Sequence, residues 1–258
     1  MITSFTKNST KWSLVGLAVI LLISGCALTN AKTDVSQKGD NVIEYATQLK
    51  FSAVPTSELP AEKPEAGLKE LKGTELELQI SGKKVLVKLY QGTDSHDVYA
   101  FLIDEGQSYS IGLASSYSLL GINELIASDL TGNGQNELLI SGDMGAAYVE
   151  LKVIGYDAET KRWLNLLTMG TPKIVDLDGD GKSELMAVSA AGSIPSYLLI
   201  YQWTQGHFEM ADVVKQLGNV YTTLVEQDGS TLIQSGTDDA KKLFRYADGE
   251  LAEVNTTE

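Results

Sequence analysis

Short segments in which apolar and polar residues alternate recur along the chain, and each is bounded by residues that favour turns. This alternation predicts β-strands that bury one face. A clear case is the pair of segments 242–246 and 250–254, which flanks Ala247-Asp248-Gly249, because Asp-Gly between alternating segments is a strong hairpin signal. No segment of this region has the apolar spacing of a long helix. The pattern therefore predicts an all-β domain over residues 67–258.

The strand segments recur with a period of roughly 40–50 residues, which is typical of propellers and other repeat arrays. The expected units cover about residues 67–118, 119–169, 170–217 and 218–258, with three or four strands in each. Small units of this kind cannot bury their apolar faces alone and must stack. We therefore expect a small propeller-like array of about four blades. An open or partial propeller, or a β-sandwich built from the same hairpins, is equally compatible with the pattern.

The third unit contains the most acidic turn of the chain, residues 176–184, which read Asp-Leu-Asp-Gly-Asp-Gly-Lys-Ser-Glu. Carboxylates this close repel one another unless a cation neutralises them, and Ca²⁺ accepts about 6–8 oxygen ligands in flexible geometry. The expected ligands are the side chains of Asp176, Asp178, Asp180 and Glu184 and the backbone carbonyl of Lys182. The competing interpretation is an acidic hairpin turn that holds no metal.

The loop begins like an EF-hand, but that motif requires an acidic residue at position 12, where this chain has Ala187. A short apolar strand follows, and no helix. A loop that closes with Glu184 at its ninth position and leads into a strand resembles the calcium loops of FG-GAP and VCBS-type repeats. Such repeats build the propellers of integrin alpha subunits and many bacterial surface proteins. The resemblance implies structural metal sites beneath blade faces that bind proteins or glycans.

A second copy of this frame lies one unit earlier, at residues 129–137, which read Asp-Leu-Thr-Gly-Asn-Gly-Gln-Asn-Glu. Its candidate ligands are Asp129, Thr131, Asn133, Gln135 and Glu137. Two carboxylates of the first loop are replaced here by neutral side chains. Because affinity falls with the number of charged ligands, we expect a weaker calcium site or a loop that keeps only its turn shape. A degenerate third copy occurs around Asp228-Gly229.

The N-terminus has the pattern of an export signal. Lys7 and Lys11 precede an apolar run at 14–23, and Ile23-Ser24-Gly25-Cys26 follows. The run is too short to span a bilayer, which needs about 20 residues. Its end resembles the lipobox of bacterial lipoproteins. The resemblance implies that residues 1–25 are removed and that Cys26, the single cysteine of the chain, receives a diacylglyceryl group.

Residues 26–66 are polar, acidic and punctuated by prolines, which is typical of an extended spacer. We therefore expect a lipid-anchored tether that holds the domain at the extracytoplasmic face of a bacterial plasma membrane or outer membrane. Two or more acyl chains are needed for stable anchoring. Within this range, residues 41–51 carry enough apolar side chains to form one strand or a short helix against the domain.

The formal net charge of −14 argues against nucleic acid as a partner, since that affinity comes largely from Lys and Arg on phosphates. The two histidines, His96 and His207, belong to no catalytic pattern, and zinc, hydrolase-elbow and Walker-type motifs are absent from the sequence. We therefore expect a binding module for an envelope protein or glycan, and no enzyme. The alternative is an envelope glycan hydrolase that uses paired carboxylates.

Trp163 and Trp203 occur at comparable places in successive units. Repeated aromatic residues of this kind favour packing between units. The alternative is a row of exposed surfaces on which sugars stack.

Overall fold

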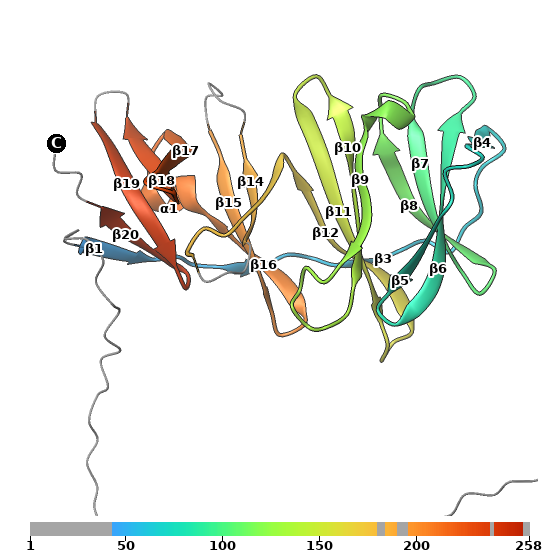
Figure 1. Ribbon diagram of the computed structural model, residues 1–258, viewed down its shortest axis with the longest axis horizontal. Helices are drawn as coiled ribbons and strands as arrows, with labels where there is room; N and C mark the ends of the chain where they lie inside the picture. The colour runs from blue at the N-terminus through green and yellow to red at the C-terminus, as the bar shows by residue number, and fades with distance from the viewer. Residues whose placement is uncertain (1–42, 180–183, 190–195, 238–239, 255–258) are drawn as a thin grey trace, which may run out of the picture. The chain divides into compact units, whose positions relative to one another are not determined.

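The computed structural model describes residues 43–179, 184–189, 196–237 and 240–254, and the fold is all-β, as predicted (Figure 1). The described strands form four antiparallel sheets, none of which closes on itself. We number them I to IV by the chain order of their main strands. The helical elements among the described residues are the short α1 (Val213–Leu217) and the 3₁₀ turn η1 (Leu119–Gly121).

Each sheet consists mainly of strands that follow one another along the chain. Sheet I contains β4 (Leu68–Glu70), β5 (Leu76–Ile80), β6 (Lys83–Gly92), β7 (Val98–Asp104) and β8 (Gln107–Ser115). Sheet II contains β3 (Ser57–Glu58), β9 (Ile122–Ser128), β10 (Glu137–Gly145), β11 (Tyr148–Asp157) and β12 (Arg162–Gly170). Sheet III contains β2 (Ser52–Ala53), β13 (Pro172–Val175), β14 (Glu184–Val188), β15 (Leu198–Thr204) and β16 (His207–Asp212). Sheet IV contains β1 (Ile43–Gln48), β17 (Tyr221–Gln227), β18 (Ser230–Thr237), β19 (Ala240–Ala247) and β20 (Glu250–Val254).

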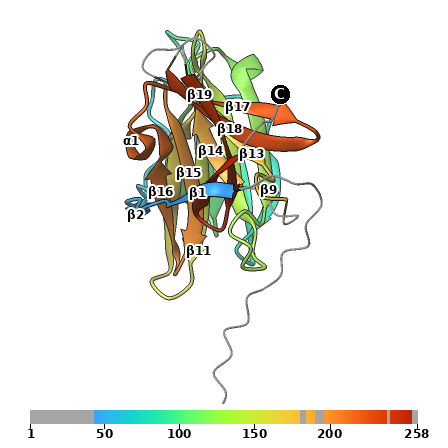
Figure 2. The same cartoon turned by 90° about the vertical axis from the view of Figure 1, so that its left-hand side faces the viewer.

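The sheets stack face to face in chain order, with a separate apolar core between each neighbouring pair (Figures 1 and 2). Strand β10 shows how one strand serves two cores. Leu138 and Ile140 pack toward sheet I, whereas Leu139 packs toward sheet III. Successive residues of a strand point to opposite faces, so a strand between two sheets must be apolar on both. This explains the unbroken apolar runs of the two inner sheets.

The first segment of the described chain, residues 43–60, runs along the outer strand of every sheet, and we call it the N-terminal belt. Strand β1 pairs with β20, β2 with β16 and β3 with β12. The backbone N–H of Ser110 on β8 then donates to the carbonyl of Pro60 at 2.9 Å. Figure 1 shows the belt passing from sheet IV to sheet I, against the order of the repeats.

The belt corrects the expected tether 26–66 where it covers residues 43–60, and β1 is the strand that was one of the two expectations for residues 41–51. Its pairings are only two residues long in sheets II and III, so Pro55, which lies between them, does not interrupt any strand. Leu49 and Leu59 anchor it, with exposed fractions of 3% and 5%. The belt also adds a fifth strand to sheets II, III and IV, where three or four strands were expected. The part of the expected tether before residue 43, the signal segment 1–25 and the anchoring Cys26 lie outside the described residues.

Candidate metal centre and adjoining pocket

The acidic loop connects β13 to β14 in sheet III, and its ends are held together by strand pairing. Val175 lies opposite Glu184 in the register of the two strands. Leu177 points inward and is 4% exposed, so it fixes the loop to the core between sheets III and IV. Gly179 adopts a positive φ of 79°, a conformation that costs glycine little. The backbone therefore turns back on itself within a few residues.

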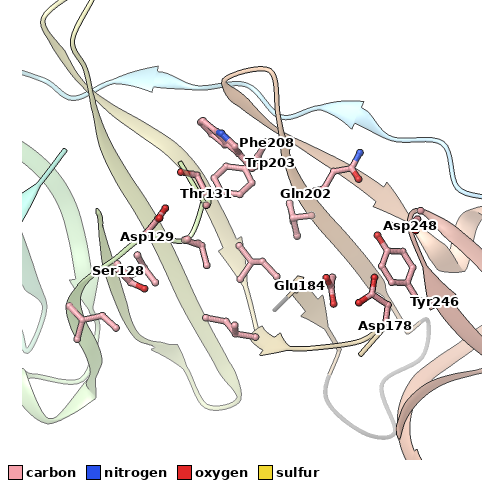
Figure 3. A pocket seen from close by; sticks show the side chains of 18 of the residues that line it. Ser128, Asp129, Thr131, Asp178, Glu184, Gln202, Trp203, Phe208, Tyr246 and Asp248 are labelled. Carbon is pink, nitrogen blue, oxygen red and sulfur yellow. The ribbon is translucent and has the colours of Figure 1, made fainter. Parts of the chain in front are cut away.

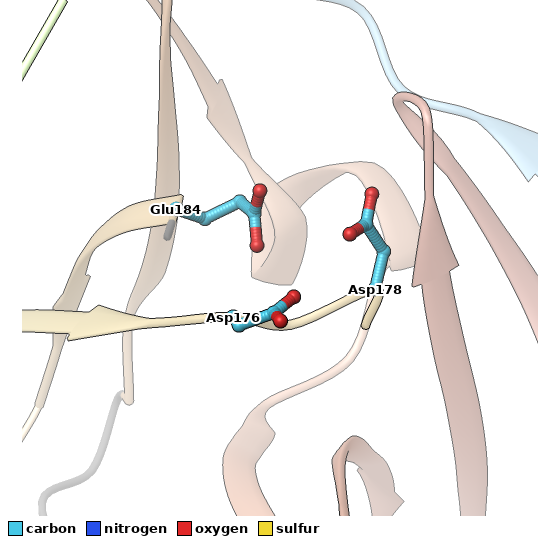
Figure 4. Close-up of side chains that lie close together, drawn as sticks. All are labelled: Asp176, Asp178 and Glu184. Carbon is cyan, nitrogen blue, oxygen red and sulfur yellow. The ribbon is translucent and has the colours of Figure 1, made fainter. Parts of the chain in front are cut away.

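Three carboxylates of the loop face a common space (Figure 4). Asp176, Asp178 and Glu184 each offer one oxygen, and these oxygens lie within 4.8 Å of one another. Two oxygens on opposite sides of a Ca²⁺ ion, each at about 2.3–2.6 Å, lie about 5 Å apart. The separation is therefore compatible with one shared ion. In the part of the chain that the structure describes, this is the one group of three such residues. The other two expected ligands, Asp180 and Lys182, lie outside the described residues.

Backbone hydrogen bonds hold two of these carboxylates in place. The N–H of Leu177 donates to Oε2 of Glu184 at 2.7 Å, and the N–H of Gly179 donates to Oδ1 of Asp176 at 2.7 Å. Because these N–H groups carry only a partial positive charge, they offset only part of the negative charge of the carboxylates. Three carboxylates at this spacing repel one another by roughly 1 kcal/mol per pair in water and about 3.5 kcal/mol at an effective dielectric constant of 20. A divalent cation would remove this repulsion.

Sheet IV approaches the loop through Tyr246, which lies on β19 and is 5% exposed. Burial, followed by the negative charge of Glu184, raises the pKa of Tyr246 to about 12, and Asp178 adds to the shift. The loop of sheet III thus lies against the second hairpin of sheet IV. A cation bound here would stiffen a contact between two sheets as well as the loop itself.

The second loop connects β9 to β10 in sheet II and is held by hydrogen bonds within the loop. Glu137 is 2% exposed. Its Oε2 accepts from the N–H groups of Leu130 and Thr131 at 3.0 and 3.3 Å, and its Oε1 accepts from Oγ1 of Thr131 at 3.0 Å. Burial raises the pKa of Glu137, although these donors oppose the shift. Both oxygens of this carboxylate therefore already have protein partners.

The remaining candidate ligands of the second loop also bind within it. Asp129 accepts from the N–H of Asn133 at 3.1 Å through Oδ1 and from the N–H of Gly134 at 2.9 Å through Oδ2. Oδ1 of Asn133 accepts from the N–H of Gln135 at 2.7 Å. This geometry favours the interpretation of a loop stabilised by its own hydrogen bonds. The degenerate third copy is a two-residue hairpin turn between β17 and β18, with Asp228 at φ 51° and Gly229 at φ 76°.

A pocket of about 760 Å³ joins the two loops. Figure 3 shows that its lining crosses from Asp129 and Thr131 of sheet II, past Trp203 of sheet III, to Tyr246 and Asp248 of sheet IV. Sequence reasoning did not reveal this pocket, because its walls come from three different units. Parts of its wall were recognisable one by one, because the two nine-residue loops and the Asp248-Gly249 turn are distinct features of the sequence.

The two tryptophans have different surroundings. Trp163 is 1% exposed and its Nε1 donates to Oδ2 of Asp104 at 3.0 Å, across the interface of sheets I and II. Trp203 is half-buried, lines the pocket and packs edge-on against Phe208 with ring centroids 4.9 Å apart. Packing between sheets thus explains Trp163, whereas Trp203 reaches the pocket wall.

Neither histidine is among the described residues that line the pocket. Nε2 of His207, at the start of β16, is 3.6 Å from Oε1 of Glu209, and His96 lies in the connection between β6 and β7.

Comparison with known proteins gives no direct guide to function: no family model, curated protein or solved structure matches this chain. Among the described residues, no helix has the length and apolar character needed to cross a bilayer. Functional conclusions therefore rest on the fold and on the geometry of the acidic loop and the pocket.

Proposed function

We propose that this protein is a bacterial envelope lipoprotein whose β-sheet array binds Ca²⁺ at the loop of residues 176–184 and acts as a binding module. The observation that carries the proposal is the convergence of Asp176, Asp178 and Glu184 on one space, with oxygens within 4.8 Å of one another. The propeller-like interpretation of the array belongs to this proposal. Support comes from the four stacked sheets, each built from consecutive antiparallel strands.

The cation has a structural role in this proposal. It neutralises the loop that joins β13 to β14 and stiffens the contact with Tyr246 of sheet IV. Calcium that binds only the folded state stabilises it by RT ln(1 + [Ca²⁺]/Kd), about 2.7 kcal/mol at 100 times Kd. A domain of this size gains about 2–4 °C in Tm per kcal/mol. The expected rise in Tm at that concentration is therefore about 5–11 °C.

Thermal unfolding of the full-length protein in detergent, with calcium and with chelator, tests the metal site. Asp178→Asn keeps the size of the side chain and removes one charge, so it should abolish most of the calcium-dependent rise. Asp228→Asn provides the matched control, because Asp228 is an exposed aspartate in the hairpin turn of sheet IV. An identical Tm of the wild type in calcium and in chelator would refute the metal site.

Lipid anchoring is proposed from the sequence around Cys26 and needs its own test. Growth with a radiolabelled fatty acid should label the wild-type protein and leave Cys26→Ser unlabelled. Membrane fractionation should show the wild type with the envelope and the variant released from it. Equal labelling of both chains would refute modification at Cys26.

The alternative proposal is a glycan hydrolase that uses paired carboxylates in the pocket, with Asp178 and Glu184 as the candidate pair. Retaining glycosidases hold their two carboxyl groups about 5–5.5 Å apart. The presence of Asp176 as a third carboxylate in the same cluster favours a cation site over an acid–base pair. Release of reducing sugar from envelope glycans, lost in Glu184→Gln, would favour the hydrolase instead.

A further inference from the structure

The pocket extends well beyond the acidic loop of sheet III. In its part between sheets II and III, the lining includes Ile126 on β9 and Ile174 on β13. Each of these isoleucines is 45% exposed, and both are among the few large hydrophobic residues that the described structure exposes. Exposed apolar side chains inside a concave surface are characteristic of binding sites.

The rim of the same pocket is acidic. Glu124, Asp129 and Asp248 are exposed carboxylates at its edge, and none of them takes part in a salt bridge among the described residues. The described lining contains neither Lys nor Arg. Together with the net charge of −14, this arrangement favours a positively charged occupant.

The dimensions of the pocket favour an extended occupant. Its lining reaches from sheet II across sheet III to sheet IV, and sheets packed face to face lie about 10 Å apart. The pocket therefore spans roughly 20 Å, the length of about six residues of extended chain. Its volume of about 760 Å³ lies in the range of known ligand sites, about 300–1,000 Å³. In sheets II and III the belt pairs with β12 and β16, whereas Ile126 and Ile174 lie on the other edge strands, β9 and β13, which have no further strand beside them among the described residues.

We infer that the pocket binds an extended basic segment of a partner protein. Its Lys or Arg side chains meet the carboxylates of the rim, and its aliphatic side chains cover Ile126 and Ile174. The inference rests on the proposed function as a binding module and adds the place and the chemistry of the partner. A sugar would need a broad exposed aromatic face, whereas Trp203 is half-buried against Phe208, which is 2% exposed.

Fluorescence anisotropy with labelled octapeptides tests this inference on the full-length protein in detergent. The probe alternates lysine and valine; one comparison peptide replaces lysine by glutamate and another replaces valine by serine. We expect the lysine–valine peptide to bind most tightly, with a Kd that rises with ionic strength as surface charges are screened. A chito-oligosaccharide serves as the glycan probe.

Variants locate the binding site. Glu124→Gln combined with Asp248→Asn removes two rim charges and should raise Kd about 2- to 30-fold, since each exposed ion pair contributes about 0.2–1 kcal/mol. Ile126→Ser should raise it as well. The matched control, Glu62→Gln with Asp228→Asn, removes two exposed charges elsewhere. Asp228, like Asp248, precedes the glycine of an Asp-Gly turn and has a similar positive φ (51° at Asp228, 47° at Asp248). The control should leave Kd within about twofold.

Equal affinity for the lysine and glutamate peptides, equal effects of the rim and control variants, or binding of the oligosaccharide alone would each overturn the inference. Measurements in calcium and in chelator separate it from the metal proposal. Peptide selectivity without any calcium effect on Tm would leave this inference standing and refute the metal site. A calcium-dependent Tm without peptide selectivity would support the metal site and refute this inference.

Discussion

The N-terminal belt makes a sharp prediction, because a flexible tether would carry no buried leucine. Leu59 is 5% exposed and packs in the core between sheets I and II. Its N–H donates to the carbonyl of Trp163 at 2.8 Å. Truncation of a buried leucine to alanine costs about 2–5 kcal/mol. Because Leu59 lies at the edge of its core, we expect the lower part of this range for Leu59→Ala, about 2–3 kcal/mol, and a fall in Tm of about 4–12 °C.

Differential scanning calorimetry and urea unfolding of the full-length chain measure this cost. Leu120→Ala is the matched control, since it makes the same chemical change at a side chain that is 94% exposed and should alter stability by less than about 0.5 kcal/mol. Leu49→Ala should repeat the effect at the interface of sheets III and IV, where Leu49 is 3% exposed. If Leu59→Ala and Leu120→Ala unfold at the same temperature as the wild type, the belt is not part of the folded core.

Three further predictions concern single contacts. Trp163→Phe removes the donor to the buried Asp104 and should cost about 1.5–3 kcal/mol in urea unfolding; a loss below about 0.5 kcal/mol would show that this hydrogen bond contributes little. Burial raises the pKa of Glu137, which means that the folded state favours the protonated carboxyl. This contribution to stability is complete below the unfolded pKa of about 4.3 and is lost as pH rises through the folded pKa. The wild type should therefore gain more stability on acidification than Glu137→Gln, and parallel stability–pH curves would contradict this. Negative charge on Glu184 helps raise the pKa of Tyr246 to about 12, so bound calcium should lower that pKa. An ultraviolet absorbance titration measures it, and Tyr246→Phe identifies which part of the signal belongs to Tyr246. A titration that calcium leaves unchanged would count against the proposed ion.

The strands and hairpins of the repeat domain could be predicted from the sequence because their signals are local. Alternation of apolar residues defined the segments around the Asp248-Gly249 turn, and the structure has β19 and β20 there. The carboxylate cluster was also local, since Asp176, Asp178 and Glu184 belong to one loop whose ends pair in adjacent strands. A turn of nine residues brings such side chains together without help from the rest of the fold.

The first part of the belt was expected, since β1 (Ile43–Gln48) lies in the segment 41–51, but the rest could not be predicted because its signal is not local. Ser52-Ala53 pairs with β16, more than one hundred residues later, and two residues carry no periodicity. The polar, proline-containing composition around it dominated the interpretation. The pocket was hidden for a related reason. Ile126 and Ile174 belong to different sheets, and only the stacking of those sheets places both on one concave surface.

The two nine-residue loops share a sequence frame but differ at its third position. In both, the N–H of the leucine at the second position donates to the closing glutamate, at 3.0 Å in sheet II and 2.7 Å in sheet III. At the third position, Thr131 donates its hydroxyl to Glu137, whereas Asp178 places a carboxylate near Glu184.

Replacing a donor by a carboxylate exchanges a hydrogen bond worth about 1 kcal/mol for a repulsion of about 1–3.5 kcal/mol at this distance. In the loop of sheet II, both oxygens of the closing Glu137 accept hydrogen bonds from the loop itself. The loop of sheet III gathers three like charges in one space, and the free energy of holding them there falls when a divalent cation joins them. For this reason we expect calcium to act on sheet III and its contact with sheet IV, and to leave the contact between sheets I and II unchanged.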